Sequence, residues 1–390
     1  MKILAVSPTD LNNLNAGNKI AIYRTLREFQ TAGHEINYLC YTDEEILNNN
    51  NFNNPKGLNK PKKVNLLSIY KMITGESYLF TRFYSTKMVN EIINKLENDN
   101  IEILLFEHTY MAIHLINKKI KNLVKEKNIK VIVDSHVLEY EAYEKLFEKN
   151  NKKSILHRKF LRSIEKSEKK YISKADMAIT YGKEDYQEII KYTNKDKVLL
   201  KPVSMDIDPV KNVNKEKAVI FYGTFSWFPN EDGLRYFINE IIEHVDKDIK
   251  VYIAGRNIPK WAYKVKKDNL IILGEVESMK DTVANKALTI VPLRIGGGTR
   301  IKILEAMSWG KAVLSTRIGA EGICKEGEDG FIIIEDNPIK FAEKINYYLN
   351  NDEKLSEFES KSLEFIEKNY SESIISKQIN IKIYDIFKLK

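Results

Sequence analysis

The stretch VPLRIGGGTRIKILEAMSWGKAV, residues Val291–Val313, contains the local pattern that decides the fold. An apolar run ends at Leu293, three glycines follow, and apolar residues recur at helical spacing up to Gly310, after which a second apolar run begins. The pattern predicts a strand, a glycine-rich turn, a helix and another strand, which together form the βαβ unit of a doubly wound α/β domain.

The predicted helix begins with two cations, Arg300 and Lys302. A helix N-terminus carries about half a positive charge and disfavours cations by a few tenths of a kcal/mol. They become favourable when an anion binds there, and the glycines give that anion access to free backbone N–H groups. Thr299 is predicted to be the N-cap, and Glu305, on the same helix face as Lys302, is predicted to hold ribose hydroxyls. A glycine-rich turn with exposed cations is the alternative interpretation.

The remaining chain alternates strand and helix patterns in two sets. The first set begins with a strand over Lys2–Val6, a helix over Asn18–Thr31 and the strand HEINYLC, and it continues with predicted strands over Ile101–Phe106 and Lys130–Asp134 and a helical run over Ile113–Lys125 between them. The second set begins with the strands KAVIFYG and KVYIAGR. A linker is predicted near Ser204–Asn214, and a turn-rich loop is predicted over Leu47–Lys63. The length of 390 residues suits two domains.

The bulk composition favours a cytoplasmic protein. The chain has two distant cysteines and no apolar run of about 18 residues, so neither a disulfide framework nor a membrane span is expected. The net charge of +8 permits anionic partners. The basic run Asn151–Lys170 is interpreted as a solvated helix face, with contact to anionic lipid as the alternative. No nucleic-acid module accompanies it, so nucleic acid is excluded as a partner.

Two further features contain residue types that can bind metal or substrate. MDID, Met205–Asp208, contains a D-x-D pair of the kind that holds a metal-bound nucleotide sugar, but a polar linker turn is the favoured interpretation. The six histidines lack metal-ligand spacing, so no metal site is predicted. His136 ends a predicted strand, where open α/β sheets bind ligands, and is a candidate site residue with a structural role as the alternative.

Several stretches in order and spacing resemble the retaining, GT-B-fold glycosyltransferases of family 4, also called group 1. They are FYGTFSWFPNEDGLRYF, VYIAGR, LGEVESMKDTVANKALTIVPLRIGGGTRIKILEAMSWGKAVLST and GAEGI in the second half, and EHTYMA, VDSHVLEYEAYEKL and ADMAITYGKED in the first. The motif G-x-G-T-R-x-K is similar to that of one subgroup. Two features depart from the family pattern. Gly297 stands where a glutamate is common, and no cation lies between Gly223 and Arg235, so Arg300 and Lys302 are hypothesised to replace the usual diphosphate-binding pair.

The resemblance implies two Rossmann-like, doubly wound domains that face each other across a cleft. Residues 1–205 would bind the acceptor, residues 206–370 the nucleotide sugar, and residues 371–390 would form a helix that packs on the first domain. The implied reaction transfers a sugar from a nucleotide-diphosphate sugar (UDP, GDP or dTDP) to a hydroxyl, with retention and without an obligatory metal or cofactor. A surface polysaccharide, glycolipid or glycoprotein glycan is the expected acceptor. A nucleotide-sugar epimerase and a non-catalytic scaffold subunit remain as alternatives.

The resemblance also assigns residues to roles. The catalytic residues would be His136, Arg300, Lys302 and Glu305. The donor-binding residues would be Gly223, Thr224, Arg256, Glu275, Val276, Gly297, Gly298, Thr299, Arg300, Ile301, Lys302 and Glu305, and the acceptor-side residues would be Gly17, Asn18 and His136. Expected assembly states are a homo-oligomer or a glycosyltransferase complex, with peripheral membrane contact.

Overall fold

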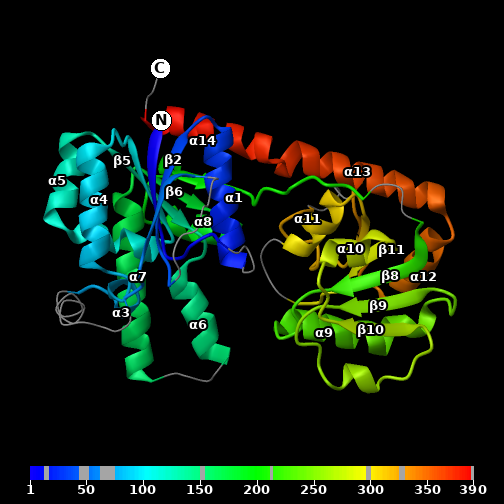
Figure 1. Ribbon diagram of the computed structural model, residues 1–390. Coiled ribbons are helices and arrows are strands. Elements are labelled where there is room, and N and C mark those ends of the chain that lie inside the picture. Colours follow the sequence, from blue (N-terminus) through cyan, green and yellow to red (C-terminus); the bar gives the residue numbers. More distant parts are fainter. Residues whose placement is uncertain are drawn as a thin grey trace. The chain divides into compact units, whose positions relative to one another are not determined.

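The computed structural model describes residues 1–12, 17–43, 52–61, 75–149, 154–210, 214–295, 300–324 and 330–387. The chain divides into two compact units (Figure 1). The first unit consists of Met1–Val203 together with Glu372–Lys390, and the second of Ser204–Ser371.

The first unit is built on a parallel sheet with the strand order β3-β2-β1-β4-β5-β6-β7. Its strands are β1 (Lys2–Ser7), β2 (Glu35–Tyr41), β3 (Asn53–Leu58), β4 (Ile103–Glu107), β5 (Lys130–Ser135), β6 (Met177–Thr180) and β7 (Val198–Leu200). The order reverses between β1 and β4, and ligands of open parallel sheets bind beyond the carboxyl ends of strands at such a switch point.

Helices cover both faces of this sheet (Figure 1). The helical elements of the unit are α1 (Gly17–Thr31), α3 (Tyr78–Thr81), α4 (Thr86–Asn98), the 3₁₀ helix η1 (Thr109–Ile116), α5 (Lys118–Glu126), α6 (Glu139–Lys149), α7 (Ile155–Lys174), α8 (Lys183–Ile189), the 3₁₀ turn η2 (Lys195–Lys197) and α14 (Glu372–Phe387). The apolar sides of α4, α5 and α7 pack on one face, with Leu104 and Phe106. Those of α1 and α14 pack on the other, with Ile103 and Leu105, as the period-two alternation of β4 requires.

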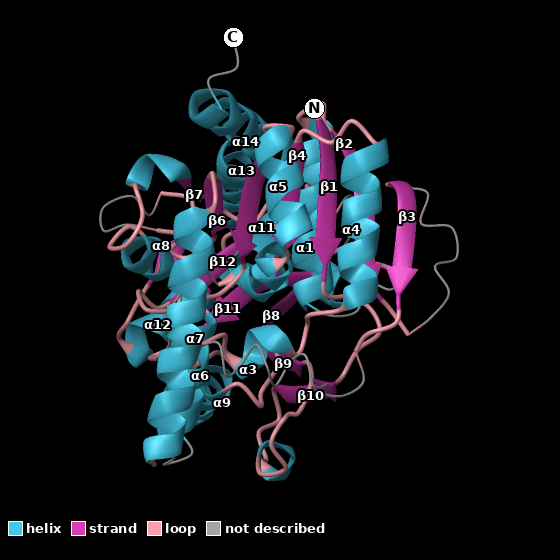
Figure 2. Ribbon diagram, turned by 90° about the vertical axis from the view of Figure 1, so that its left-hand side faces the viewer, coloured by secondary structure: helices cyan, strands magenta, loops and turns pink. Residues whose placement is uncertain are grey.

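Two predictions for this unit are corrected. The segment Leu47–Lys63, predicted as a loop, contains strand β3, which Figure 2 shows at the edge of the sheet. Pro55 is tolerated there because an edge strand has one side without ladder hydrogen bonds. The helical pattern predicted over Ile113–Lys125 is divided between η1 and α5, because Asn117 adopts an extended conformation and caps α5 with its side chain.

The second unit is built on another parallel sheet, with the order β10-β9-β8-β11-β12-β13. Its strands are β8 (Glu216–Tyr222), β9 (Lys250–Ala254), β10 (Leu270–Gly274), β11 (Lys286–Val291), β12 (Ala312–Ser315) and β13 (Ile333–Ile334). The switch point lies between β8 and β11, so Gly223 and the segment after Val291 flank it.

The second sheet is also covered by helices. They are α9 (Phe228–Tyr236), continued by the π-helical turn η3 (Phe237–Ile241) and the 3₁₀ turn η4 (Ile242–His244), then η5 (Ala262–Lys264), α10 (Met279–Ala284), α11 (Ile301–Ser308), α12 (Pro338–Leu349) and α13 (Asp352–Tyr370). α12 packs against β8 and β11, and α13 packs against β12 and α11. Within the described parts of the chain, we find no helix with the length and apolar character that crossing a bilayer requires.

Candidate functional site

The helix that follows the glycine-rich segment, α11, begins one residue later than predicted. Arg300 occupies the N-cap position with an extended backbone and makes no capping hydrogen bond with its side chain. The prediction that Thr299 is the N-cap is therefore wrong, and Thr299 itself lies outside the described residues, as do Gly297 and Gly298. Ile301 and Lys302 form the first turn, and Tyr222, at the end of β8, fixes that turn by donating its hydroxyl to the Lys302 carbonyl at 2.7 Å.

The side chain of Lys302 lies directly beside the end of β8. Its Nζ donates to Asn230 Oδ1 at 2.6 Å and lies 4.9 Å from the centroid of the Phe221 ring. Asn230 is buried and donates its Nδ2 to the Thr224 carbonyl at 2.9 Å. Burial, and to a smaller extent the neighbouring charge of Arg300, lower the pKa of Lys302 to about 7 against the opposing effect of Glu305.

Gly223 is the residue that lets the backbone approach this lysine. It has a φ of +153°, which L side chains rarely adopt. A Cβ atom there would lie 2.8 Å from Asn230 Nδ2 and 2.9 Å from Lys302 Nζ. A glycine is therefore required at the switch point, where its bare backbone and an ammonium group adjoin.

Arg300 and Glu305 flank Lys302 along α11, Arg300 at the N-cap and Glu305 in the second turn. Arg300 is only 4% exposed, and its guanidinium carbon lies 5.3 Å from the ring centroid of Trp227, within the range of a cation–π contact. Glu305 is half-buried one turn after Lys302, and its charge raises the pKa of Tyr222, a smaller effect than the burial of that hydroxyl. The charges of Arg300 and Glu305 therefore both act on Lys302 near the start of α11.

The other predicted donor residues in the described chain lie beyond the carboxyl ends of neighbouring strands. Arg256 follows β9 and donates its Nε to Glu275 Oε1, after β10, at 2.8 Å on the exposed surface. The Arg256 carbonyl accepts the backbone N–H of Phe225, which ties the loop after β9 to the loop after β8. Val276 is half-buried next to Glu275.

In the first unit, His136 is part of a buried cluster at the carboxyl end of the sheet. Its Nε2 donates to Glu107 Oε2 at 2.9 Å and lies 3.6 Å from Asp134 Oδ2. Glu107 and Asp134 are register partners on β4 and β5, so the ladder itself places both carboxyl groups at this edge. Tyr181 donates its hydroxyl to Asp134 Oδ2 at 2.7 Å, and the His108 ring stacks on His136 at 4.4 Å between centroids.

The charges in this cluster shift its pKa values. Burial opposes the charged form of His136, but Asp134 and Glu107 outweigh burial and raise its pKa. Burial also raises the pKa of Glu107, and the adjacent Asp134 adds to that rise. Burial and the neighbouring charge of His136 lower the pKa of His108.

Sequence reasoning missed Asn230, Glu107 and Asp134. The sequence did contain signals for them, because Glu107 and Asp134 each lie at or next to the end of a predicted strand and Asn230 lies in SWFPN. Of the predicted acceptor-side residues, Gly17 and Asn18 form the start of α1.

Glu107, Asp134 and His136 place one ligand-type atom each within 4.8 Å of one another, the spacing at which such side chains hold a metal ion. We describe them as a hydrogen-bonded cluster, in which His136 Nε2 lies 2.9 Å from Glu107 Oε2 and Asp134 Oδ2 accepts from the Tyr181 hydroxyl.

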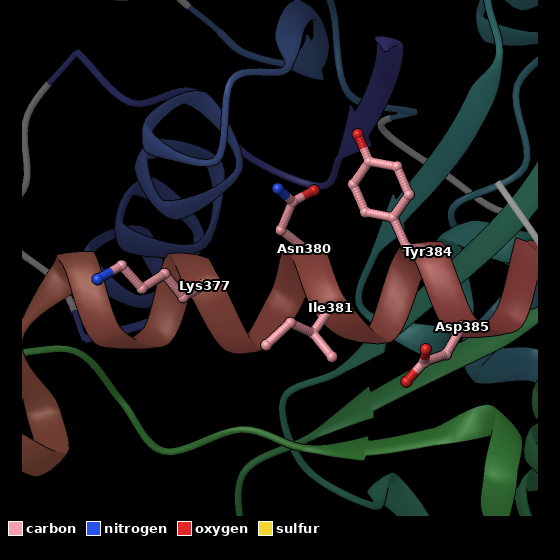
Figure 3. Close-up of a pocket in the computed structure, with 5 residues that line it drawn as sticks. All are labelled: Lys377, Asn380, Ile381, Tyr384 and Asp385. Atoms are coloured by element: carbon pink, nitrogen blue, oxygen red, sulfur yellow. The ribbon is translucent and has the colours of Figure 1, made fainter. Parts of the chain in front are cut away.

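Two other features lie apart from these residues. In MDID, Asp208 forms an ion pair with Lys280 and donates its backbone N–H to the Ser308 carbonyl at 3.1 Å, as a linker turn would. A surface cavity of about 360 Å³ is lined by Lys377, Asn380, Ile381, Tyr384 and Asp385, all on α14 (Figure 3). None of the predicted site residues lines that cavity.

Comparison with known proteins identifies the class of this fold. Residues 216–351 match the family described as Glycosyl transferases group 1. A curated relative, an uncharacterized 44.6 kDa protein in the cps region of Klebsiella pneumoniae, is 29% identical over 185 residues. That alignment covers 44% of this chain and 46% of the relative.

Solved structures match nearly the whole chain. TarM from S. aureus has a TM-score of 0.65 at 15% identity over 98% of this chain and 99% of its own. HepE from Anabaena in complex with UDP has a TM-score of 0.64 at 12% identity, with coverage of 97% and 98%. Sucrose-phosphate synthase from Thermosynechococcus elongatus has a TM-score of 0.67 at 13% identity over the full length of both chains. This chain has the GT-B fold. The predicted fold class of two Rossmann-like α/β domains is thereby confirmed.

Proposed function

We propose that this GT-B protein is a glycosyltransferase that moves a sugar from a nucleotide-diphosphate sugar to a hydroxyl acceptor, with retention of the anomeric configuration. The observation that carries this proposal is the position of Lys302, partly buried beside the bare backbone of Gly223 at the switch point of the second sheet. The pKa of this half-buried ammonium group is lowered to about 7, mainly by burial. A bound anion would therefore stabilise its charged form strongly. The match of residues 216–351 to the group 1 family supports the same conclusion.

The second unit would supply the charge that the reaction needs. Lys302 and Arg300 would bind the diphosphate and neutralise the negative charge that develops on it as the sugar leaves. A single well-placed donor of this kind contributes about 3 kcal/mol to transition-state stabilisation. Glu305, one helical turn further, would accept the ribose hydroxyls. Gly297, Gly298 and Thr299 would complete the diphosphate site with backbone N–H groups.

The other predicted residues would define the rest of the substrate site. Gly223, Thr224, Arg256 and Ile301 would line the donor site, with the backbone of Glu275 and Val276 against the base. His136, Gly17 and Asn18 would belong to the acceptor side. No nucleophile is assigned, so attack from the leaving-group face, with the phosphate accepting the acceptor's proton, is the proposed route to retention. Since protein cations would neutralise the diphosphate, we expect EDTA to leave transfer intact.

The comparisons guide the choice of substrates. TarM has been solved with UDP and alpha-GlcNAc-glycerol, and HepE with UDP and glucose. UDP sugars are therefore the first donors to test, before GDP and dTDP sugars. Because one relative is encoded in a cps region, we propose a surface polysaccharide as the acceptor, ahead of a glycolipid or a glycoprotein glycan.

One experiment tests the function and separates it from the two alternatives. The purified chain is screened by thermal shift against UDP, GDP and dTDP sugars, because a ligand that binds the native state raises Tm by mass action. The best donor is then incubated with and without a glycan acceptor. Transfer or slow donor hydrolysis supports the proposal, an isomeric donor formed without acceptor indicates an epimerase, and no reaction with a bound donor indicates a scaffold subunit.

We further propose that the protein works in the cytoplasm at an anionic membrane face, alone, as a homo-oligomer or within a glycosyltransferase complex. The N-terminal end of α7 supports the membrane contact, since Ile155 and Leu156 are 66% and 78% exposed there. Arg158, Lys159 and Arg162 are exposed on the same helix. Exposed apolar side chains flanked by cations have the chemistry that binds the headgroup region of anionic lipids.

A further inference from the structure

We infer that Glu107 and Asp134 are positioning residues that hold His136 as an imidazolium and leave its Nδ1–H to donate to an oxygen of the bound substrate. The inference rests on the proposed function, because it takes the substrate to be a sugar with hydroxyl and phosphate oxygens.

The geometry distinguishes the two nitrogens of His136. Nε2 donates to Glu107 Oε2 at 2.9 Å and lies 3.6 Å from Asp134 Oδ2, so two carboxyl groups face one nitrogen. Among the described residues, Nδ1 has no hydrogen-bond partner. A ring held at one nitrogen by two acids becomes a cationic donor at the other, and such a donor bonds an oxygen more strongly than a neutral imidazole does.

The two carboxyl groups are themselves fixed by the fold. Both are fully buried, and they are directly opposite in the β4–β5 register. Tyr181 donates to Asp134 Oδ2 at 2.7 Å, and Tyr181 in turn shares a 2.7 Å hydrogen bond with Thr25 of α1. Since Tyr181 anchors Asp134 Oδ2 and the β4–β5 register fixes the backbone of both acids, the imidazole cannot rotate away without leaving Glu107 and Asp134 buried and uncompensated.

Several polar atoms at this edge of the sheet are buried without hydrogen-bond partners in the described chain, which is energetically unfavourable. Glu107 Oε1, Asp134 Oδ1 and His108 Nε2 are buried and have no hydrogen-bond partner among the described residues. His108 also has a φ of 67°, which is unfavourable for a non-glycine residue. Strain and unsatisfied polar groups concentrate at functional sites, and Glu107, Asp134 and His108 are residues that contact His136 directly.

The charged and titratable groups around His136 come from five elements. They are Glu107 and His108 at the end of β4, Asp134 on β5, Tyr181 after β6, Lys201 after β7, and Glu28 on α1. Lys201 opposes the charged imidazole, but it is ion-paired to Glu28. The carboxyl groups of Glu107 and Asp134, in direct reach of Nε2, therefore dominate, and they raise the pKa of His136 despite its burial.

The test is an NMR titration of the histidine Cε1–H signals, with His136 assigned through His136→Gln. In wild type we expect a midpoint above the ordinary value of about 6.5. In Glu107→Gln and in Asp134→Asn it should fall by about 1 unit or more, because each change removes one nearby negative charge. The matched control is Glu139→Gln, which removes another carboxyl group whose pKa burial raises to about 7, but which is not among the groups that act on His136.

The same variants give a second measurement that requires activity. In Glu107→Gln, we expect transfer to fall about tenfold at pH 8 and to change less at pH 6, because the pKa of Glu107 is raised to about 7 and its carboxyl group carries little charge in the wild type at that pH. The proposal is overturned if the midpoint of His136 is the same in Glu107→Gln, Asp134→Asn and wild type. It is also overturned if the wild-type protein binds stoichiometric Zn²⁺ that Glu107→Gln loses, since a metal ion would then take the place of the proton. If the midpoints shift as expected but no donor sugar is transferred, the proposed function fails and the positioning role remains.

Discussion

Lys302 Nζ donates a hydrogen bond to Asn230 Oδ1 at 2.6 Å, which joins the first turn of α11 to α9 across the end of β8. The pair puts a cation at a helix N-terminus, where the macrodipole alone would disfavour it. Asn230 holds the ammonium group at this position, and its own amide is fixed by the Thr224 carbonyl.

Replacing the charge of Lys302 should separate stability from activity. Lys302→Gln keeps a donor for Asn230 but removes the positive charge, so we expect transfer to fall about a hundredfold. At pH 7 the free variant should be at least as stable as wild type, because it no longer holds a half-buried ammonium group. Circular dichroism checks the fold, Tm measures stability, and initial rates measure transfer. Near-normal turnover of the folded variant would remove Lys302 from the site, and Lys280→Gln, at an exposed ion pair, is the control.

Donor binding should weaken as the pH rises above neutrality. The pKa of Lys302 in the free protein is lowered to about 7, mainly by burial, and a bound diphosphate favours the charged form. Above pH 7 the lysine must therefore take up a proton on binding, and Kd for the best nucleotide sugar should rise by up to about tenfold per pH unit. Calorimetry from pH 7 to 8.5 in two buffers of different ionisation enthalpy measures both affinity and proton uptake. Lys302→Gln should show neither effect, and an equally pH-dependent Kd in that variant would assign the effect elsewhere.

The sequence allowed the prediction of the α/β class and of strands such as β8, β9 and β11, because continuous apolar runs bounded by glycine or polar residues produce them directly. It also indicated Lys302 as a candidate anion-binding residue, since a cation at the start of a helix is unusual. It did not predict β3, because strand formation by NNPKGL depends on pairing with β2 and not on local propensity.

The sequence did not indicate the roles of Asn230 and Glu107, because each contacts its partner only in the folded structure. Asn230 is 72 residues from Lys302 in the chain, and Glu107 is 29 residues from His136. Each pair meets only because parallel strands bring their carboxyl ends to one edge. The N-cap of α11 was predicted one residue early because Thr299 has high capping propensity, whereas the backbone of Arg300 occupies that position.

A single methyl group at Gly223 should disrupt the proposed donor site around Lys302. In Gly223→Ala the added Cβ would lie within 3 Å of both Asn230 Nδ2 and Lys302 Nζ, on a backbone with φ of +153°. We expect the thermal shift caused by the best donor to disappear, together with a loss of stability of about 1–3 kcal/mol. Gly330→Ala, where an added Cβ meets nothing within 4 Å, is the matched control. Retention of full donor binding by a stable Gly223→Ala variant would contradict the close approach of the donor to this backbone.

The buried ion pair between Lys201 and Glu28 should contribute strongly to the stability of the first unit. Both side chains are almost fully buried, and Lys201 Nζ also donates to Thr25 Oγ1 at 3.3 Å. Lys201→Met leaves the Glu28 carboxylate uncompensated, so we expect a loss of about 3–5 kcal/mol in the free energy of unfolding. The double variant Glu28→Gln/Lys201→Met removes both charges and should recover much of that loss. Urea unfolding of wild type, Glu28→Gln, Lys201→Met and the double variant gives the coupling energy, and a loss in the double variant equal to the sum of the two single losses would show that the charges are not coupled.

The exposed end of α7 should bind anionic membranes in a salt-dependent manner. Co-sedimentation with phosphatidylglycerol-containing vesicles should decrease as ionic strength rises, because cations such as Arg158 and Arg162 contribute through screened attraction. Ile155→Ser/Leu156→Ser removes two exposed apolar side chains and should lower the partition coefficient about tenfold or more without changing Tm. Ile339→Ser, at an exposed isoleucine of the second unit, is the control. Equal sedimentation of all variants with neutral and anionic vesicles would exclude this end of α7 as the membrane contact.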